Sequence, residues 1–429
     1  AYTITITGES TKAFELFSGF ATTGTASKTI SFVQNQQGSP RSEDVFSSIR
    51  GYPKTGCFYQ GRLVLGGTKS KPQSIIMSKA GSAFNLDTGE GDDDEAIFIT
   101  ISSRKLNNIV DVFPGRNLQI FTDGSEFSVN QTPITPSNVD VSPQTSHGAI
   151  NIEVADIDGA TLFADRNGKS IKSYLFSFQE DSYTTNDISV LSPELISNPV
   201  NLSILGGDAA DDANWLFIIN DDGNAAVLNT LREQDINGFT RWITDGELTN
   251  SVVVDKDLYM ANKRTIGGVD SYFIELWSFD HLMDNSVKRN PTGSQITNLD
   301  YLDGQTVQVV ADGIVLPERI VSSGVIELDS SEIGYFNFEV GINFISSLSS
   351  MPINSNPGSG QNQMRLKKIV RMNARVQNTS GLYVEGIPVA VRQFGDSSDS
   401  PLDSPPNVES GIIDDIFGLS GWDRYNSMP

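Results

Sequence analysis

The chain has 429 residues and carries 53 acidic against 30 basic side chains, which gives a formal net charge of -23. A hydrophobic content of 38% with 9% aromatic residues is ordinary for a folded globular protein and excludes global disorder. The acidity disfavours general binding to nucleic acid, because like charges repel, and the single Cys57 excludes an internal disulfide framework. Because no apolar run is long enough to cross a bilayer, we expect no stable membrane insertion, and the first residues predict no signal peptide.

The first predicted element is a strand at the beginning of the chain. Tyr2, Ile4 and Ile6 alternate with threonines, which is the two-residue period of a half-buried strand. Short apolar groups separated by Ser, Thr and Gly continue to residue 50. We therefore expect an N-terminal β segment over residues 1–50.

Residues 51–290 are predicted to form an all-β, β-propeller-like array of four-stranded blades. Apolar strand cores recur at intervals of about 40 to 55 residues, the length that four short strands and their turns need. The cores contain Leu63, Leu118, Leu162, Trp215 and Leu258. Each is followed by a turn signal, and these signals are Gly66-Gly67, Asp123-Gly124, Asn167-Gly168, Asp222-Gly223 and Gly267-Gly268. A long meandering sandwich is the structural alternative.

A smaller inserted β domain is expected over residues 291–385. Residues 284–298 are polar, and Asn290-Pro291-Thr292-Gly293 among them predicts a linker. Hairpin patterns follow up to Leu328, one of them around Asp312-Gly313, with a further strand between Phe336 and Phe344. Residues 346–363 are rich in Ser, Asn, Pro and Gly, which predicts a projecting loop. Residues 386–429 are predicted to be a C-terminal segment that returns to the blades.

The most concentrated basic cluster follows the projecting loop and consists of Arg365, Lys367, Lys368, Arg371 and Arg375. One interpretation is a contact patch for DNA or for an acidic neighbouring subunit. The other is the solvated face of a strand, because apolar residues alternate with the cations. We favour the strand face and keep the five residues as a candidate contact patch.

Few residues indicate catalysis. His147 and His281 are the only histidines and lie far apart in the sequence, which disfavours a Ser-His-Asp triad or a multi-histidine metal site. The acidic run Asp92–Glu95 could ligate calcium, but no spaced calcium-binding pattern surrounds it, so a solvated loop is the preferred interpretation. A pair of carboxylates for glycoside hydrolysis stays open. We predict no catalytic, cofactor-binding or metal-binding residue.

An ordered series of motifs, spread over roughly residues 50 to 400, resembles the tail nozzle proteins of short-tailed bacteriophages, also called tail tubular protein B. The motifs are Gln60–Gln73, Ser78–Gly81, Phe84–Leu86, Asp92–Asp94, Phe113–Leu118, Gly124–Val129, Gln144–Ala149, Asp165–Lys169, Asn220–Gly223 and Leu302–Val307. Members of this family usually carry further segments at both ends.

The resemblance implies a non-enzymatic virion component, made in the host cytoplasm and located in the phage tail. Its implied partners are identical copies in a hexameric ring, the adaptor protein, tail fibres or other tail proteins, and genomic DNA in transit without sequence-specific binding. It implies no cofactor. In that setting Asn354, Asn356, Gln361 and Asn362 are candidate residues of a channel-tip loop, and acidic walls would repel the phosphates of the passing genome.

The alternative function is a carbohydrate-binding or glycoside-cleaving propeller used in host-surface attachment. Sugar rings stack on aromatic side chains, so an aromatic-lined mouth with a carboxylate pair would favour it. The four tryptophans are scattered in the sequence as Trp215, Trp242, Trp277 and Trp422. The nozzle is therefore the preferred function.

Overall fold

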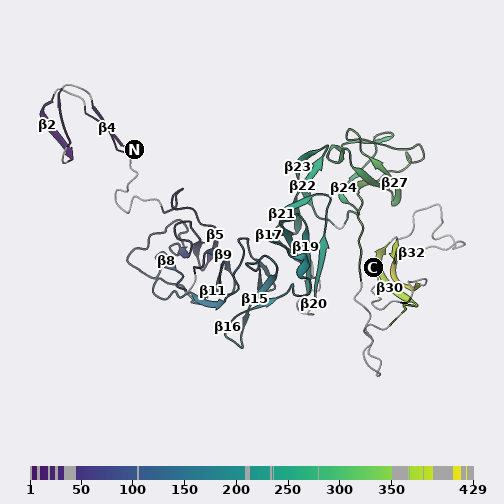
Figure 1. Ribbon diagram of the computed structural model, residues 1–429, viewed down its shortest axis with the longest axis horizontal. Coiled ribbons are helices and arrows are strands. Elements are labelled where there is room, and N and C mark those ends of the chain that lie inside the picture. The colour runs from purple at the N-terminus through teal and green to yellow at the C-terminus, as the bar shows by residue number, and fades with distance from the viewer. Residues whose placement is uncertain are drawn as a thin grey trace. The chain divides into compact units, whose positions relative to one another are not determined.

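The computed structural model describes the backbone strands of the first 32 residues and most of the chain from residue 45 onward (Figure 1). The described residues are 2–6, 10–17, 20–24, 28–32, 45–103, 106–207, 213–231, 234, 236–278, 280–349, 366, 368–379, 381–389, 409–416 and 422. Contacts divide the chain into two compact units, Ala1–Asn198 and Pro199–Pro429. This division falls inside the predicted segment 51–290, and the predicted domain boundaries stay a prediction.

The first unit contains three four-stranded antiparallel sheets and two short hairpin-like pairs. The pairs are β1 (Tyr2–Ile6) with β4 (Lys28–Phe32) and β2 (Ser10–Phe17) with β3 (Phe20–Gly24). The first sheet joins β5 (Thr55–Tyr59), β6 (Arg62–Gly66), β7 (Ser74–Met77) and β8 (Ile97–Thr100). The second joins β9 (Ile109–Pro114), β10 (Leu118–Thr122), β11 (Glu126–Val129) and β12 (Ser142–Thr145). The third joins β13 (Ala155–Ile157), β14 (Ala160–Ala164), β15 (Ile171–Ser177) and β16 (Ser182–Asp187), and the 3-10 turn η2 (Pro193–Leu195) follows.

The second unit begins with two more sheets of the same kind. The fourth sheet joins β17 (Pro199–Leu205), β18 (Asn214–Asn220), β19 (Ala225–Leu231) and β20 (Ile236–Trp242). The fifth joins three strands, β21 (Glu247–Val254), β22 (Asp257–Ile266) and β23 (Val269–Leu276).

A smaller sheet and several strand pairs complete the second unit. The small sheet has the order β24 (Asp284–Arg289), β29 (Phe338–Ile342), β26 (Thr306–Ala311) and β27 (Ile314–Ile320). The pairs are β25 (Gln295–Ile296) with β28 (Ile326–Glu327), β30 (Met372–Thr379) with β33 (Glu409–Ile416), and β31 (Leu382–Val384) with β32 (Ile387–Val389). The 3-10 turn η4 (Asp300–Leu302) precedes β26.

The predicted fold class is confirmed, because the described chain is an array of propeller-like sheets with a smaller β domain. In the first five sheets each strand pairs with the next one along the chain, which is the up-and-down order of strands in a propeller blade. The five apolar cores found by sequence all lie in the second strand of their sheet, namely in β6, β10, β14, β18 and β22. The predicted rhythm therefore corresponds to one sheet per repeat.

The five predicted turn signals also occupy one equivalent position, the connection between the second and third strands. At four of these connections the chain that leads into the next sheet is hydrogen-bonded to the turn. In the first unit, the backbone N–H of Ile109 donates to the carbonyl of Pro72 at 2.8 Å, and that of Ala149 donates to Thr122 at 2.8 Å. The N–H of Asn198 donates to the carbonyl of Gly168 at 2.7 Å, and that of Leu248 donates to Gly223 at 2.9 Å. Within each unit, the entry to the next sheet is thus fixed by the turn of the preceding sheet.

Side-chain burial shows how the sheets stack. Every residue of β10 is buried: Leu118 and Ile120 belong to the core shared with the first sheet, and Phe121 belongs to a second core that contains Phe163 and Tyr174 of the third sheet. In β6, by contrast, buried and half-buried residues alternate. A sheet between two others therefore loses the two-residue polarity pattern, because both of its faces are covered.

The polar residues 284–289 form a strand of the small domain, which their composition did not predict. They make up β24, which pairs antiparallel with β29 and places Val287 opposite Val340. Val287 packs against the buried core of the small domain, whereas the polar neighbours in the strand are half-buried or exposed. The predicted hairpin around Asp312-Gly313 is confirmed by β26 and β27.

We predict that Gly223 is less replaceable than Gly268, although both lie in strand 2–3 turns of the second unit with φ of 80° and 82°. A Cβ at Gly223 would lie 2.8 Å from Cβ of Glu247, while nothing lies within 4 Å at Gly268. Gly268→Ala should lower the free energy of unfolding by about 1 kcal/mol, and Gly223→Ala by about 3 kcal/mol.

Urea unfolding followed by tryptophan fluorescence measures both changes, because Trp215, Trp242 and Trp277 contribute to the core of the second unit. Equal losses for the two variants would show that the contact between the turn and β21 does not constrain this position.

Candidate functional site

Asp111 links three consecutive sheets through one buried carboxylate. Its Oδ1 accepts hydrogen bonds from the Thr55 hydroxyl in β5 at 2.5 Å and from the Val112 amide in its own strand at 2.8 Å. Its Oδ2 accepts one from the Val154 amide, just before β13, at 2.9 Å. Burial raises the pKa of Asp111 above its ordinary value, and these hydrogen bonds oppose the rise. The carboxylate serves as a joint between sheets.

Glu126 has a similar role at the connection between the second and third sheets. It is fully buried in β11, where its carboxylate accepts hydrogen bonds from the Thr145 hydroxyl at 2.5 Å and from the amides of His147 and Gly148 at 3.2 and 2.6 Å. These groups belong to β12 and to the chain that leads away from it. Glu126 therefore fixes the path between two sheets.

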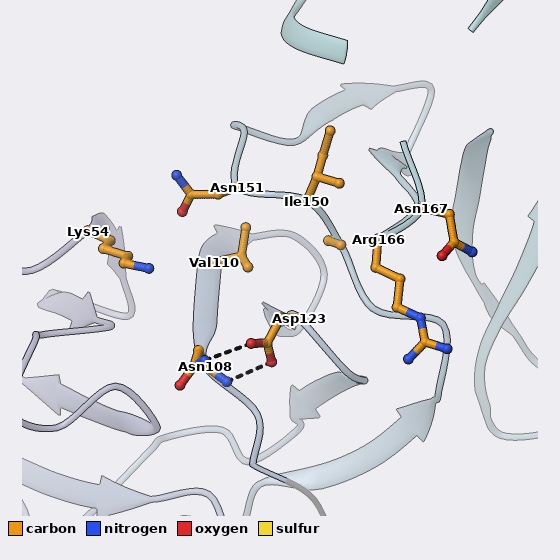
Figure 2. Close-up of a pocket in the computed structure, with 9 residues that line it drawn as sticks. Lys54, Asn108, Val110, Asp123, Ile150, Asn151, Arg166 and Asn167 are labelled. Atoms are coloured by element: carbon orange, nitrogen blue, oxygen red, sulfur yellow. Dashed lines mark hydrogen bonds between the residues drawn. The ribbon is translucent and has the colours of Figure 1, made fainter. Parts of the chain in front are cut away.

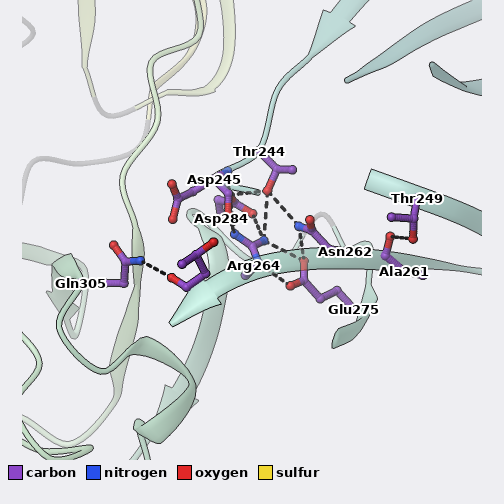
Figure 3. Close-up of polar contacts among 10 residues, drawn as sticks. Thr244, Asp245, Thr249, Ala261, Asn262, Arg264, Glu275, Asp284 and Gln305 are labelled. Atoms are coloured by element: carbon purple, nitrogen blue, oxygen red, sulfur yellow. Dashed lines mark hydrogen bonds and ion pairs between the residues drawn. The ribbon is translucent and has the colours of Figure 1, made fainter. Parts of the chain in front are cut away.

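Arg264 is the centre of a polar cluster in the second unit (Figure 3). Its side chain is 2% exposed and pairs with Glu275 of β23 at 2.6 Å and with Asp284 of β24 at 3.0 Å. The guanidinium also donates to the Thr244 hydroxyl at 3.0 Å and to the Asp245 carbonyl at 2.5 Å. The cluster ties the fifth sheet to the first strand of the small domain.

The charges in this cluster stabilise one another. Burial by itself would lower the pKa of Arg264, but its bonds to Glu275 and Asp284 raise that pKa above its ordinary value. Burial likewise would raise the pKa of Asp284, and Arg264 holds it below its ordinary value. Both groups therefore remain charged at neutral pH.

A depression of about 480 Å³ lies in the first unit, where the entries of successive sheets and two strand 2–3 turns meet (Figure 2). The exposed side chains of Lys54 and Arg166 line it together with Asn108, Asp123 and Asn167. Asp123 accepts hydrogen bonds from the backbone and side-chain N–H groups of Asn108 at 2.9 and 2.7 Å. The lining offers polar contacts to a partner but has no histidine, cysteine or second carboxylate for acid–base chemistry.

The acidic run Asp92–Glu95 folds around cations of the chain itself. The guanidinium of Arg62, which is 3% exposed, donates to the backbone carbonyls of Asp93 and Glu95 at 2.7 and 2.6 Å. Lys79 pairs with the Asp94 carboxylate at 2.9 Å. Across the residues described, no group of three or more His, Cys, Asp and Glu side chains could hold a metal ion.

The two histidines lie in different units and take part in separate contacts. His147 contributes its backbone amide to Glu126 in the first unit. In the second unit the Nδ1 atom of His281 lies 2.8 Å from the Ser286 hydroxyl and 3.5 Å from the Glu339 carboxylate.

The candidate contact patch is only partly described. Arg365 and Lys367 lie outside the described residues, whereas Lys368, Arg371 and Arg375 are exposed. Arg371 directly precedes β30, and Arg375 lies within it. Met372 and Ala374 between them pack against a small apolar cluster. The role of the patch stays a prediction. The candidate channel-tip residues Asn354, Asn356, Gln361 and Asn362 all lie outside the described residues.

Three tryptophans that are scattered in the sequence come together in the core of the second unit. The ring of Trp277 lies 6.2 Å from Trp215 and 5.9 Å from Trp242, measured between ring centroids. Phe217 packs edge-on against Trp277 at 5.6 Å. These rings support packing between the fourth and fifth sheets and do not form an open aromatic platform.

Sequence reasoning missed the buried charges Asp111, Glu126 and Arg264. A signal was present for the first, because Asp111 interrupts an otherwise apolar strand core. Glu126 and Arg264 gave no such signal, because polar residues are ordinary in strands. Their hydrogen-bonding and ion-pair partners lie in other segments of the chain, and only the folded structure shows which segments meet.

Comparison with known proteins assigns no family. No protein-family model and no curated protein sequence match the chain. Among solved structures it is similar to YCF48 from Cyanidioschyzon merolae, with 11% identity, a TM-score of 0.30 and coverage of 50% of this chain and 69% of that chain. It is also similar to the structure of YCF48 bound to D1 peptide, with 10% identity and a TM-score of 0.31. That match covers 71% of this chain and 96% of that chain.

BBS1N in complex with ARL6DN gives 8% identity and a TM-score of 0.28, with coverage of 68% of this chain and 92% of that chain. These TM-scores are too low to carry an argument about fold or function. The fold assignment therefore rests on the strand order of this chain. In the part of the chain that is described, no helix is long and apolar enough to cross a membrane.

We predict that Arg264→Met strongly destabilises the second unit, because it leaves the half-buried carboxylates of Glu275 and Asp284 without their buried cation. Loss of one partner of a buried ion pair lowers the free energy of unfolding by about 3 to 5 kcal/mol. Chemical denaturation measures the loss.

Lys263→Met is the matched control, because Lys263 is the preceding residue of β22 and pairs with Glu247 and Asp270 at the surface. Exposed pairs contribute little, so this variant should unfold almost as the native chain does. Equal effects of the two substitutions would contradict the role assigned to the buried cluster.

The lowered pKa of Asp284 predicts a loss of stability in acid. The native protein releases this proton more readily than the unfolded chain, whose Asp pKa is about 3.9. The contribution of Asp284 to the free energy of unfolding is therefore complete above that unfolded-state pKa. It disappears as the pH falls through the pKa of Asp284 in the native protein. Denaturation of the native chain and of Asp284→Asn between neutral pH and strong acid should show a shallower acid dependence in the variant. If stability fell with pH equally in the two proteins, Asp284 would be excluded as a source of the acid dependence.

Proposed function

We propose that the protein is a non-enzymatic structural component of a bacteriophage short tail, a ring-forming nozzle that extends the portal and adaptor channel and conducts the genome during ejection. The observation that carries the structural role is the use of buried ionisable side chains. Asp111, Glu126 and Arg264 each contact two or more neighbouring elements and act as joints between them. The phage-tail context comes from the ordered series of motifs that resembles tail nozzle proteins.

Rigidity is the property that these joints provide. Hydrogen-bonded charges in a dry core permit few alternative arrangements, because breaking one contact leaves an uncompensated charge. A wall that withstands pressure and passing DNA needs a fixed shape more than it needs a reactive pocket. The stacked sheets suit this requirement, and so do the hydrogen bonds between each turn and the segment that leads into the next sheet.

The net charge of -23 supports the same proposal. Acidic walls repel the phosphates of DNA, so a genome can slide past them without being retained. Assembly into a closed ring needs a head-to-tail interface between identical copies, and exposed sheet flanks offer the broad surfaces for it. The adaptor and tail fibres are the further partners that the proposal includes.

The carbohydrate alternative receives less support from the described residues. Trp215, Trp242 and Trp277, which could have formed a sugar-stacking platform, pack against one another in the core of the second unit. Trp422 is the exposed tryptophan among those described, at 70% exposure. One exposed ring does not make a binding groove.

We expect the protein to occur as a hexameric ring around the tail axis. Electron microscopy of virions labelled with an antibody fragment against the purified chain measures the position of the protein in the tail. Native mass spectrometry of the intact protein counts the copies in the ring. A gel-shift assay at physiological salt should show no retention of double-stranded DNA. A soluble monomer that cleaves a host polysaccharide would overturn the proposal.

A further inference from the structure

The fifth sheet has an open edge at β23. The first four sheets each contain four described strands, whereas the fifth contains three, and β23 pairs only with β22 within the described part of the chain. After β23 the chain enters the small domain, where β24 pairs with β29 instead of continuing the fifth sheet. Eight residues of strand therefore lack a neighbour on one side.

The open strand also carries an uncovered apolar row. Tyr272, Ile274 and Leu276 are 71, 82 and 52% exposed and alternate along one face of β23. The register places Leu276 opposite Tyr259 of β22, and Tyr259 opposite Val252 of β21, which is 54% exposed. The same face of all three strands is thus partly apolar.

The charged residues of β23 do not protect this edge. Asp270 pairs with Lys263 of β22 at 3.0 Å, and Glu275 pairs with Arg264 of β22 at 2.6 Å. Both carboxylates are engaged by the neighbouring strand. A free charge or a proline usually keeps an exposed edge from pairing with another chain, and β23 contains no proline.

Other outer strands contain such protection. Pro143 lies in β12 and Pro317 lies in β27, and proline cannot donate a ladder hydrogen bond. Arg241 lies in β20, and β8 has only four residues. The outer strand β16 also has no proline, but β23 combines an unprotected edge with an exposed apolar row.

We propose that β23 binds an extended β-strand of a partner protein, which pairs antiparallel with it and completes the fifth sheet. The chemistry of this strand follows from the fourth strands that the chain supplies elsewhere, β8 (Ile97–Thr100) and β16 (Ser182–Asp187), each of which mixes apolar and hydroxyl side chains and runs antiparallel to the third strand. The backbone ladder provides affinity, and the apolar row provides specificity. This inference does not depend on the phage-tail function.

The occupant should carry little negative charge. The chain has a net charge of -23, so a strongly acidic strand would be repelled, whereas an uncharged strand of alternating apolar and hydroxyl residues can approach. Its apolar side chains would lie beside Tyr272, Ile274 and Leu276. Its hydroxyl side chains would lie on the opposite face.

The test uses the full chain and a capped, fluorescein-labelled peptide of about seven residues that alternates isoleucine and threonine. Fluorescence anisotropy should show saturable binding, and hydrogen exchange should show new protection of the β23 amides. Ile274→Lys should weaken binding about tenfold or more, because it places an unpaired charge at the edge. Val315→Lys is the matched control, since Val315 is 68% exposed on the proline-protected strand β27, and it should bind as the native chain does.

A second peptide distinguishes strand pairing from general stickiness. The same sequence with N-methyl groups on alternate amides keeps the apolar side chains but cannot complete the ladder, so it should not bind. Circular dichroism confirms that both protein variants fold. The proposal is overturned if the native chain does not bind the probe, or if Ile274→Lys and N-methylation change nothing. It is also overturned if the β23 amides are already protected without the probe in a self-associated form, because a second copy would then cover the edge.

Discussion

The structure depends on the hydrogen bond between the turn of one sheet and the entry of the next. A twisted four-stranded sheet buries its two faces only if its neighbours are held at the correct spacing. Within the two units, the contacts from Ile109, Ala149 and Leu248 to the preceding turns fix that spacing at the backbone level. Side chains such as Asp111 then lock the inner strands that these contacts have brought together.

In this arrangement the oxygens of the buried carboxylates Asp111 and Glu126 are occupied by hydrogen bonds from neighbouring elements. A carboxylate such as Glu126, saturated by one hydroxyl and two amides, is neither a free base nor a metal ligand. The same saturation makes the sheets resist relative movement. The buried carboxylates Asp111 and Glu126 therefore hold neighbouring elements of the first unit together.

Much of the fold could be predicted from the sequence, and little of the polar network could. Leu63 and Leu118 mark the second strands correctly because a strand core with a glycine turn is a local pattern. The strand status of 284–289 was missed, because polar residues dominate it and Val287 is buried only after pairing with β29. The clustering of Trp215, Trp242 and Trp277 is likewise a consequence of sheet stacking.

The sequence by itself determined the all-β class, the repeat length, the turn positions and the acidic surface, because each depends on neighbouring residues or on totals. Tertiary structure alone decided that Arg264 joins β23 to β24, that Asp92–Glu95 wraps the cation of Arg62, and that the fifth sheet ends with an open edge. The reason is physical: hydrogen bonds and ion pairs act over a few ångströms, and which distant residues meet at that range depends on how whole sheets pair and stack.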